Sequence, residues 1–146
     1  MKLAWALALL VVGVNLSVDA QSNKLLDEIL DSPAVTYGQA AYLVLTAVNK
    51  LPEGATPAEA ADELWKIDVR NAEDPIDLGE YSVLLMKAFR LSGGLFYRLL
   101  PIPRYAAREL AWRGWIVGNA YPGRSLSGVE AVRLLGNAME VAEDRS

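Results

Sequence analysis

The residues best suited to chemistry are arginines interleaved with large aromatic side chains between positions 104 and 124. They are Arg104, Arg108, Trp112, Arg113, Trp115, Tyr121 and Arg124. A guanidinium binds carboxylate or phosphate with a planar fork, and an aromatic ring offers a flat apolar face to a sugar. The pattern predicts a ligand-binding surface for an anionic glycan or a lipid headgroup. The alternative interpretation places Trp112 and Trp115 in the core and pairs the arginines with acidic residues elsewhere.

Catalytic groups are scarce in this sequence. Cys and His are both absent, which removes thiol nucleophiles, imidazole bases and the usual transition-metal ligands. Carboxylates are the remaining acid–base option, and Glu80 and Glu109 are the two we would test. No phosphate-binding or nucleophile motif is present, and the acidic stretch 68–77 lacks the Gly and the ligand spacing of a calcium loop. We therefore expect no catalytic site, metal or cofactor.

Charge is divided unevenly along the chain. Residues 21–83 carry 4 basic and 12 acidic side chains, whereas residues 84–146 carry 9 basic and 5 acidic ones. Such asymmetry favours an anionic partner on one face, although the two halves can also neutralise each other. The formal net charge of −4 argues against nucleic acid as the partner.

The first twenty residues have the pattern of a cleaved signal peptide. Lys2 precedes an apolar run from Leu3 to Val14, and Val18 and Ala20 are small residues suited to cleavage after Ala20. This run is shorter than the roughly 18 to 20 residues that span a bilayer. We expect residues 1–20 to be removed and residues 21–146 to form one domain, exported to the periplasm or secreted and associated with the cell envelope.

One helical pattern occurs three times, at 36–48, 77–89 and 127–139. Each copy starts with an N-cap residue and has Gln or Glu three residues later, which predicts a capping box. The pairs are Thr36 with Gln39, Asp77 with Glu80, and Ser127 with Glu130. Apolar residues then recur without a gap at offsets of a helical stripe, as in Leu43, Leu84 and Leu134. The sequence therefore predicts an all-α domain of tandem repeats.

A second helix is expected before each capped helix. Ala60 to Leu64 corresponds to Ala106 to Leu110, and the stretch 24–31 supplies the first copy. The three helix–loop–helix units are then about 24–50, 57–91 and 104–142, and they form one compact helical domain. Ser92-Gly93-Gly94 should end the helix of the second unit.

The extra length before the third unit contains an apolar turn. Its large side chains are Phe96, Tyr97, Leu99 and Leu100. We expect them to cover the core, because exposed apolar patches are uncommon on soluble proteins. The alternative is a surface that contacts a membrane or a partner.

The stretch 105–139, "YAARELAWRGWIVGNAYPGRSLSGVEAVRLLGNAM", resembles the S-layer homology domain. The aromatic helix end, the Pro122-Gly123 turn and the capped helix follow that family's order. The second unit resembles a degenerate copy, and the first is similar mainly in its capped helix. The chain is also similar to spirochaete envelope proteins with such degenerate units.

The resemblance implies a secreted helical module that anchors proteins by binding anionic, pyruvylated wall polysaccharide. The family's capped helix typically opens Thr-Arg-Ala-Glu, and its Arg meets the ligand. Here the matching residues are Tyr37, Leu78 and Gly128, none of which is basic. We therefore expect a non-enzymatic envelope module that binds or scaffolds on wall glycan or peptidoglycan, a membrane surface or another envelope protein. The alternatives are a protein-interaction domain without glycan binding and a carboxylate-dependent envelope enzyme.

Overall fold

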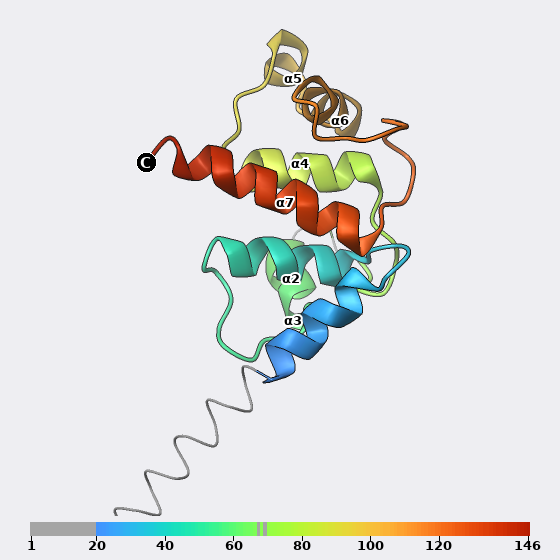
Figure 1. Cartoon of the computed structure of the whole chain (residues 1–146), viewed down its shortest axis with the longest axis vertical. Helices are drawn as coiled ribbons and strands as arrows, with labels where there is room; N and C mark the ends of the chain where they lie inside the picture. Colours follow the sequence, from blue (N-terminus) through green and yellow to red (C-terminus); the bar gives the residue numbers. More distant parts are fainter. Residues whose placement is uncertain (1–19, 67, 69) are drawn as a thin grey trace, which may run out of the picture.

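The computed structural model describes residues 20–66, 68 and 70–146 (Figure 1). A helical segment at 20–30 precedes α2 (Tyr37–Ala47), α3 (Pro57–Leu64), α4 (Leu78–Ala88), α5 (Leu95–Leu99), α6 (Pro103–Trp112) and α7 (Gly128–Glu143). This confirms the all-α prediction. The signal peptide expected at 1–20 lies, apart from Ala20, outside the described residues. Among those residues, none of the helices has the length and apolar character needed to cross a membrane.

The helices α2, α4 and α7 begin at the expected N-caps. The side chains of Thr36, Asp77 and Ser127 accept hydrogen bonds from the backbone N–H three residues on, at 3.2, 2.7 and 3.2 Å. Of these three helices, α2 alone has the full capping box, in which the Thr36 N–H donates to Gln39 Oε1 at 3.1 Å. The prediction of reciprocal boxes is wrong for α4 and α7, because charged partners from elsewhere in the fold draw away the carboxylates of Glu80 and Glu130.

The helices pair across the boundaries of the sequence units. The strongest helix contacts join α3 to α2 and α6 to α4. The end of the segment 20–30 lies against the start of α7, where the Gly128 N–H donates to the Ser32 carbonyl oxygen at 2.9 Å. Each unit's first helix thus packs on a capped helix of a different unit. A helix and the capped helix that follows it in sequence are therefore not the packing pair.

Loops close the starts of the three capped helices in a cycle. The first N–H groups of a helix lack partners inside the helix and need acceptors from elsewhere. The loop before α4 supplies them to α2, the loop before α7 supplies them to α4, and the loop before α2 supplies one to α7. The bonds run from Tyr37 to Asp74, Gly38 to Ala72, Leu78 to Arg124, Gly79 to Pro122 and Gly128 to Ser32, at 2.8 to 2.9 Å.

The residues just before the three N-caps meet in the core. Val35, Ile76 and Leu126 are at most 1% exposed. The Val35 N–H donates to the Leu126 carbonyl oxygen, and the Ile76 N–H donates to the Val35 carbonyl oxygen, both at 2.9 Å. These three residues join the loop cycle to the apolar stripes of the helices. Most of the predicted stripe is buried, but Leu84 is only half-buried.

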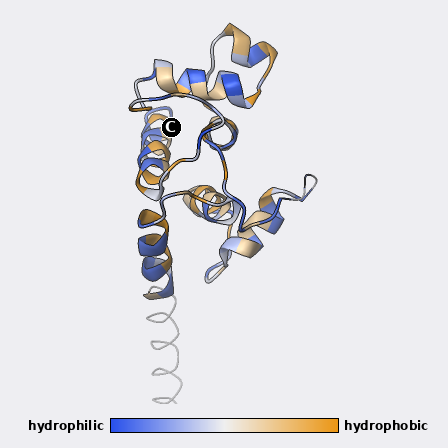
Figure 2. Ribbon diagram, turned by 90° about the vertical axis from the view of Figure 1, so that its right-hand side faces the viewer, coloured by the Kyte–Doolittle hydropathy of each residue, from blue (hydrophilic) through white to orange (hydrophobic). Residues whose placement is uncertain are grey.

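The apolar turn at 95–100 forms the short helix α5 and does not cover the core as expected. Phe96, Leu99 and Leu100 are 59%, 73% and 50% exposed, and only Tyr97 packs against the core. The reason is that α6 already closes this side of the core with Ala106, Ala107 and Leu110. Figure 2 shows the resulting apolar stretches at the end of the molecule that α5 and α6 form.

The helix before this turn also ends earlier than the glycines at 93 and 94. It ends at Ala88, and Arg90 adopts the left-handed conformation with φ 49°. The Leu91 N–H then donates to the Met86 carbonyl oxygen at 2.9 Å, which satisfies one free carbonyl of the last turn. Arg90 therefore occupies a position where Gly is normally favoured.

Candidate functional site

Three of the arginine and aromatic candidates lie on the outer face of α6. Arg104, Arg108 and Trp112 follow each other at four-residue spacing, so their side chains lie along one helical stripe. Both arginines are exposed, and Trp112 is 81% exposed. Trp112 is therefore a surface residue, and the interpretation that placed it in the core is wrong.

Arg113 and Trp115 are engaged with their own surroundings. The Arg113 guanidinium lies 5.2 Å from the centre of the Trp115 ring, and its Nη2 donates to the Ser92 carbonyl oxygen at 2.6 Å. Trp115 is half-buried against the core. These two residues fix the end of α6 to the loop before α5.

Arg124 forms the best-connected ion pair of the described residues. It donates to both carboxylate oxygens of Glu130, at 2.6 and 2.9 Å, and to the carbonyl oxygens of Asn119 and Ser125. The hydrogen bond to Glu130 raises the pKa of Arg124. The Arg124 guanidinium therefore stabilises the loop before α7. Tyr121, in the same loop, is 62% exposed. The seven candidates thus divide into an outer stripe on α6, structural contacts and one exposed tyrosine; they do not converge on one site.

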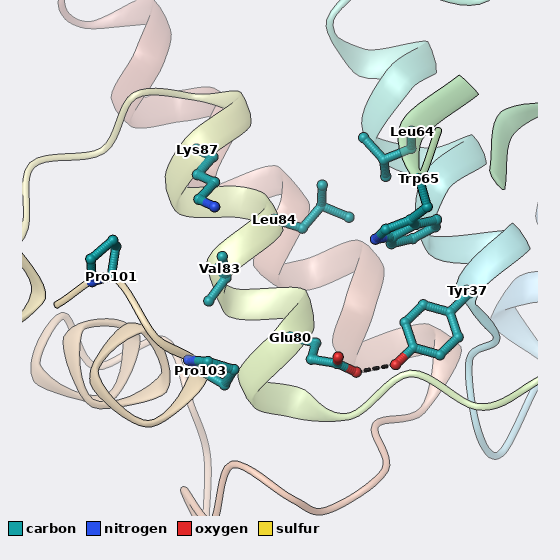
Figure 3. Close-up of a pocket in the computed structure, with 9 residues that line it drawn as sticks. All are labelled: Tyr37, Leu64, Trp65, Glu80, Val83, Leu84, Lys87, Pro101 and Pro103. Atoms are coloured by element: carbon teal, nitrogen blue, oxygen red, sulfur yellow. Dashed lines mark hydrogen bonds between the residues drawn. The ribbon is translucent and has the colours of Figure 1, made fainter. Parts of the chain in front are cut away.

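The described residues also line a groove between α3 and α4, which the sequence did not predict. Its volume is about 420 Å³. Figure 3 shows the side chains that surround it, from α2, the end of α3, α4 and the turn before α6. The lining residues are Tyr37, Leu64, Trp65, Glu80, Val83, Leu84, Lys87, Pro101 and Pro103. We call this the α3–α4 groove.

One wall of the α3–α4 groove is a single stripe of α4. Glu80, Val83, Leu84 and Lys87 recur at the helical spacing of three and four residues. This explains why Leu84 is only half-buried while its counterpart Leu134 is fully buried. On the other side of the groove lies Trp65, the C-cap residue of α3.

Aromatic packing and charge fix the base of the groove. The rings of Trp65 and Tyr37 meet edge to face at 5.1 Å and 87°. The Tyr37 hydroxyl donates to Glu80 Oε2, and Arg70 contacts Glu80 Oε1 at 3.2 Å and lies 5.4 Å from the Tyr37 ring centre. Burial, followed by the hydrogen bond to Glu80, raises the pKa of Tyr37 well above its ordinary value. Tyr37 is therefore a neutral hydrogen-bond donor near pH 7.

The two carboxylates that we singled out for catalysis hold structural partners. Glu80 accepts from Tyr37 and pairs with Arg70. Glu109 Oε1 accepts from the Gly94 N–H at 2.8 Å, which attaches α5 to α6. In the part of the chain that the structure describes, acidic side chains do not gather in groups of three or more that would hold a metal ion.

The positions at which the resemblance to the S-layer homology domain would place a ligand-binding Arg have structural roles in this fold. Leu78 is fully buried and Tyr37 is 8% exposed. Gly128 packs directly against the carbonyl of Ile29, so a side chain at this position would collide with backbone. An arginine at Leu78 or Gly128 would have to displace core or backbone atoms, whereas the side chain at position 37 lines the α3–α4 groove.

Comparisons with protein-family models, with curated proteins and with solved structures found no match to this chain. The function must therefore be argued from the groove and the surfaces of this chain. The groove could not be read from the sequence, because it lies between helices of different packing pairs. The local signal for it was a helical stripe that mixes charged and apolar residues, from Glu80 to Lys87.

Proposed function

We propose that the protein is a non-enzymatic binding module of the cell envelope and that the α3–α4 groove binds an anionic wall glycan. The observation that carries this proposal is the pairing of an aromatic wall with a cation in one groove of about 420 Å³. Trp65 stands on one side and Lys87 on the other (Figure 3). Clefts of roughly 300 to 1,000 Å³ are typical of ligand sites.

The residues of the groove match the chemistry of an acidic sugar. The apolar face of a sugar ring packs on an aromatic side chain, here Trp65. Lys87 supplies an exposed ammonium group for a carboxylate or phosphate substituent, and a charged hydrogen bond of this kind is stronger than a neutral one. Glu80, although paired with Arg70, can still accept a hydrogen bond from a sugar hydroxyl, since a carboxylate has about four acceptor positions.

A binding role accounts for the groove better than catalysis does. Of the described residues that line it, Glu80 is the only carboxylate, and it is bound to Tyr37 and Arg70. General acid–base catalysis on a glycoside normally needs two carboxyl groups on either side of the bond to be cleaved. The envelope location rests on the signal peptide expected at 1–20, and the wall ligand is the one that the family resemblance implies.

The test is co-sedimentation of the purified protein with cell-wall sacculi, before and after extraction of the anionic wall polymers. We expect retention on untreated sacculi and its loss after extraction. Lys87→Gln should weaken retention roughly tenfold or more, the effect of losing a charged hydrogen bond of about 1.5 to 3 kcal/mol. Trp65→Leu should weaken it by up to about tenfold, because an aromatic contact contributes about 0.5 to 1.5 kcal/mol.

Lys50→Gln is the matched control, because Lys50 is also an exposed lysine but lies outside the α3–α4 groove. It should leave retention unchanged, and circular dichroism should show native helicity in all three variants. Undiminished binding by folded Lys87→Gln and Trp65→Leu proteins would exclude the groove as the glycan site.

A further inference from the structure

The large exposed apolar side chains of this protein gather in one region. Of the nine that the described residues contain, seven lie between positions 95 and 121. Four of them belong to α5 and the residue after it: Leu95, Phe96, Leu99 and Leu100, which are 67%, 59%, 73% and 50% exposed. We call these four residues the α5 apolar surface. Soluble proteins seldom expose apolar side chains in such a cluster unless the surface binds something.

Specific contacts hold the α5 apolar surface on α6. The Phe96 and Tyr105 rings stack with centres 5.7 Å apart and planes inclined by 22°. Glu109 on α6 accepts from the Gly94 N–H just before α5, at 2.8 Å. The turn is thus held in place with its leucines facing solvent, and α5 and α6 together form one end of the molecule (Figure 1).

Three exposed arginines lie on α5 and on α6, the helix against which α5 packs. Arg98 lies within α5, and Arg104 and Arg108 lie on the outer face of α6, all three exposed. Within the ranges that the structure describes, none of the three takes part in an ion pair. The one acidic residue of α5 and α6 is Glu109, whose carboxylate is bound to Gly94. This end of the molecule is therefore both apolar and net positive.

We propose that α5 and the outer face of α6 form a docking surface for an anionic phospholipid bilayer. Leu95, Leu99 and Leu100 enter the boundary between headgroups and acyl chains, and the arginines bind lipid phosphates. An apolar face with Leu, Phe and Trp beside basic residues is typical of proteins that lie on a membrane. Trp112, 81% exposed on the same helix face as Arg104 and Arg108, suits the headgroup level.

The uneven charge along the chain favours the same orientation, with the α5–α6 end facing an anionic membrane. The acidic first half includes the segment 20–30 and α3, which lie away from the α5 end (Figure 1). An anionic membrane repels that half and attracts the α5–α6 end. The residues of the docking surface are not among those that line the α3–α4 groove, which adjoins this surface at Pro101 and Pro103.

Co-sedimentation with lipid vesicles tests the proposal. The purified protein is mixed with vesicles of phosphatidylcholine alone or of phosphatidylcholine with phosphatidylglycerol, at low and high salt. We expect binding roughly tenfold or more tighter on the anionic vesicles, because each basic residue at the membrane surface contributes to the attraction. High salt should reduce this difference by screening.

Two double variants separate the apolar and electrostatic contributions. Leu95→Ser with Leu99→Ser should abolish binding, because it removes apolar side chains that enter the membrane. The variant should still fold, since both side chains are exposed and their loss does not open the core. Arg104→Gln with Arg108→Gln should remove most of the preference for anionic lipid. The matched control is Val129→Ser with Arg133→Gln on α7, an exposed apolar residue and an exposed arginine outside the docking surface, and it should bind like the wild type.

Wild-type protein that stays in solution with anionic vesicles, or a folded double-serine variant that binds as well as wild type, would overturn the proposal. Sedimentation equilibrium without lipid tests the competing occupant, a second copy of the chain. A wild-type dimer that the double-serine change converts to monomer, without vesicle binding, would assign the surface to self-association instead. Lys87→Gln should leave vesicle binding intact, so failure of the glycan proposal remains distinguishable from failure of this one.

Discussion

Gly79 provides the sharpest test of how the helices pack. It lies in the first turn of α4, where its N–H donates to the Pro122 carbonyl oxygen at 2.8 Å. A Cβ at this position would lie 2.7 Å from Pro103 Cβ and 2.8 Å from Pro122 Cβ. Both neighbours are ring atoms of prolines, which have no side-chain rotation to relieve the overlap. The α4–α6 pair and the loop before α7 would therefore have to move apart.

The size of the effect follows from two opposing terms. Replacing Gly by Ala in a helix stabilises it by roughly 0.5 to 1 kcal/mol. Forcing a methyl group into a closely packed site costs about 1 to 3 kcal/mol, and the rigid prolines favour the upper part of that range. We expect Gly79→Ala to lower the free energy of unfolding by about 1 to 2 kcal/mol. For a domain of this size that lowers the melting temperature by roughly 3 to 8 °C.

Thermal melts and urea titrations of Gly79→Ala and Gly136→Ala measure this directly. Gly136 lies within α7, and a Cβ there would have no neighbouring heavy atom within 4 Å. Gly136→Ala should therefore stabilise the protein by about 0.5 to 1 kcal/mol through helix propensity alone. The two changes are chemically identical and opposite in expected sign. A Gly79→Ala protein as stable as wild type would refute the close contact between α4 and the two prolines.

Three further changes test the helix ends and the core. Ser127→Ala should reduce stability by about 0.5 to 2 kcal/mol in urea titrations, because it removes the N-cap of α7; a neutral result would place the helix start elsewhere. Arg90→Gly should raise the free energy of unfolding by about 0.5 to 1 kcal/mol, seen as a higher urea midpoint, because φ 49° strains a residue with a Cβ. A loss of stability would contradict the left-handed turn. Tyr81→Phe should cost about 1 kcal/mol at neutral pH by removing the hydrogen bond to the Ala131 carbonyl oxygen. Burial raises the pKa of Tyr81, so its contribution is complete below the unfolded pKa of about 10 and falls above it by about 1.4 kcal/mol per pH unit. Above about pH 10, the free energy of unfolding of Tyr81→Phe should fall less steeply with pH than that of the wild type, by the equivalent of about one proton. Identical slopes for the two proteins would mean that Tyr81 is not buried.

Local chemistry determined the helical class and the helix starts. An N-cap such as Ser127 acts on backbone groups within one turn, so the residues beside it in the sequence contain the needed information. The apolar stripes likewise indicated which residues face the core, and Leu43 and Leu134 are buried as the pattern predicts. These features depend on neighbours three or four positions away.

The partners of the charged cap residues were decided only by the tertiary structure. From the sequence alone, Glu80 and Glu130 fit a capping box as well as Gln39 does. A carboxylate gains more from a cation than from its own helix N–H, and the fold brings Arg70 to Glu80 and Arg124 to Glu130. Gln39 has no charge to attract such a partner, and its box closes.

The groove and the docking surface also depend on contacts between distant segments. Helix spacing in the sequence suggested pairs within each unit, whereas packing joined α3 to α2 and α6 to α4. The α3–α4 groove lies between those pairs, and α5 is exposed because α6 closes the core beneath it. A periodic pattern states that a side chain is apolar and which helical face it shares. Whether that face meets another helix, a groove or solvent is decided by which helices become neighbours in space.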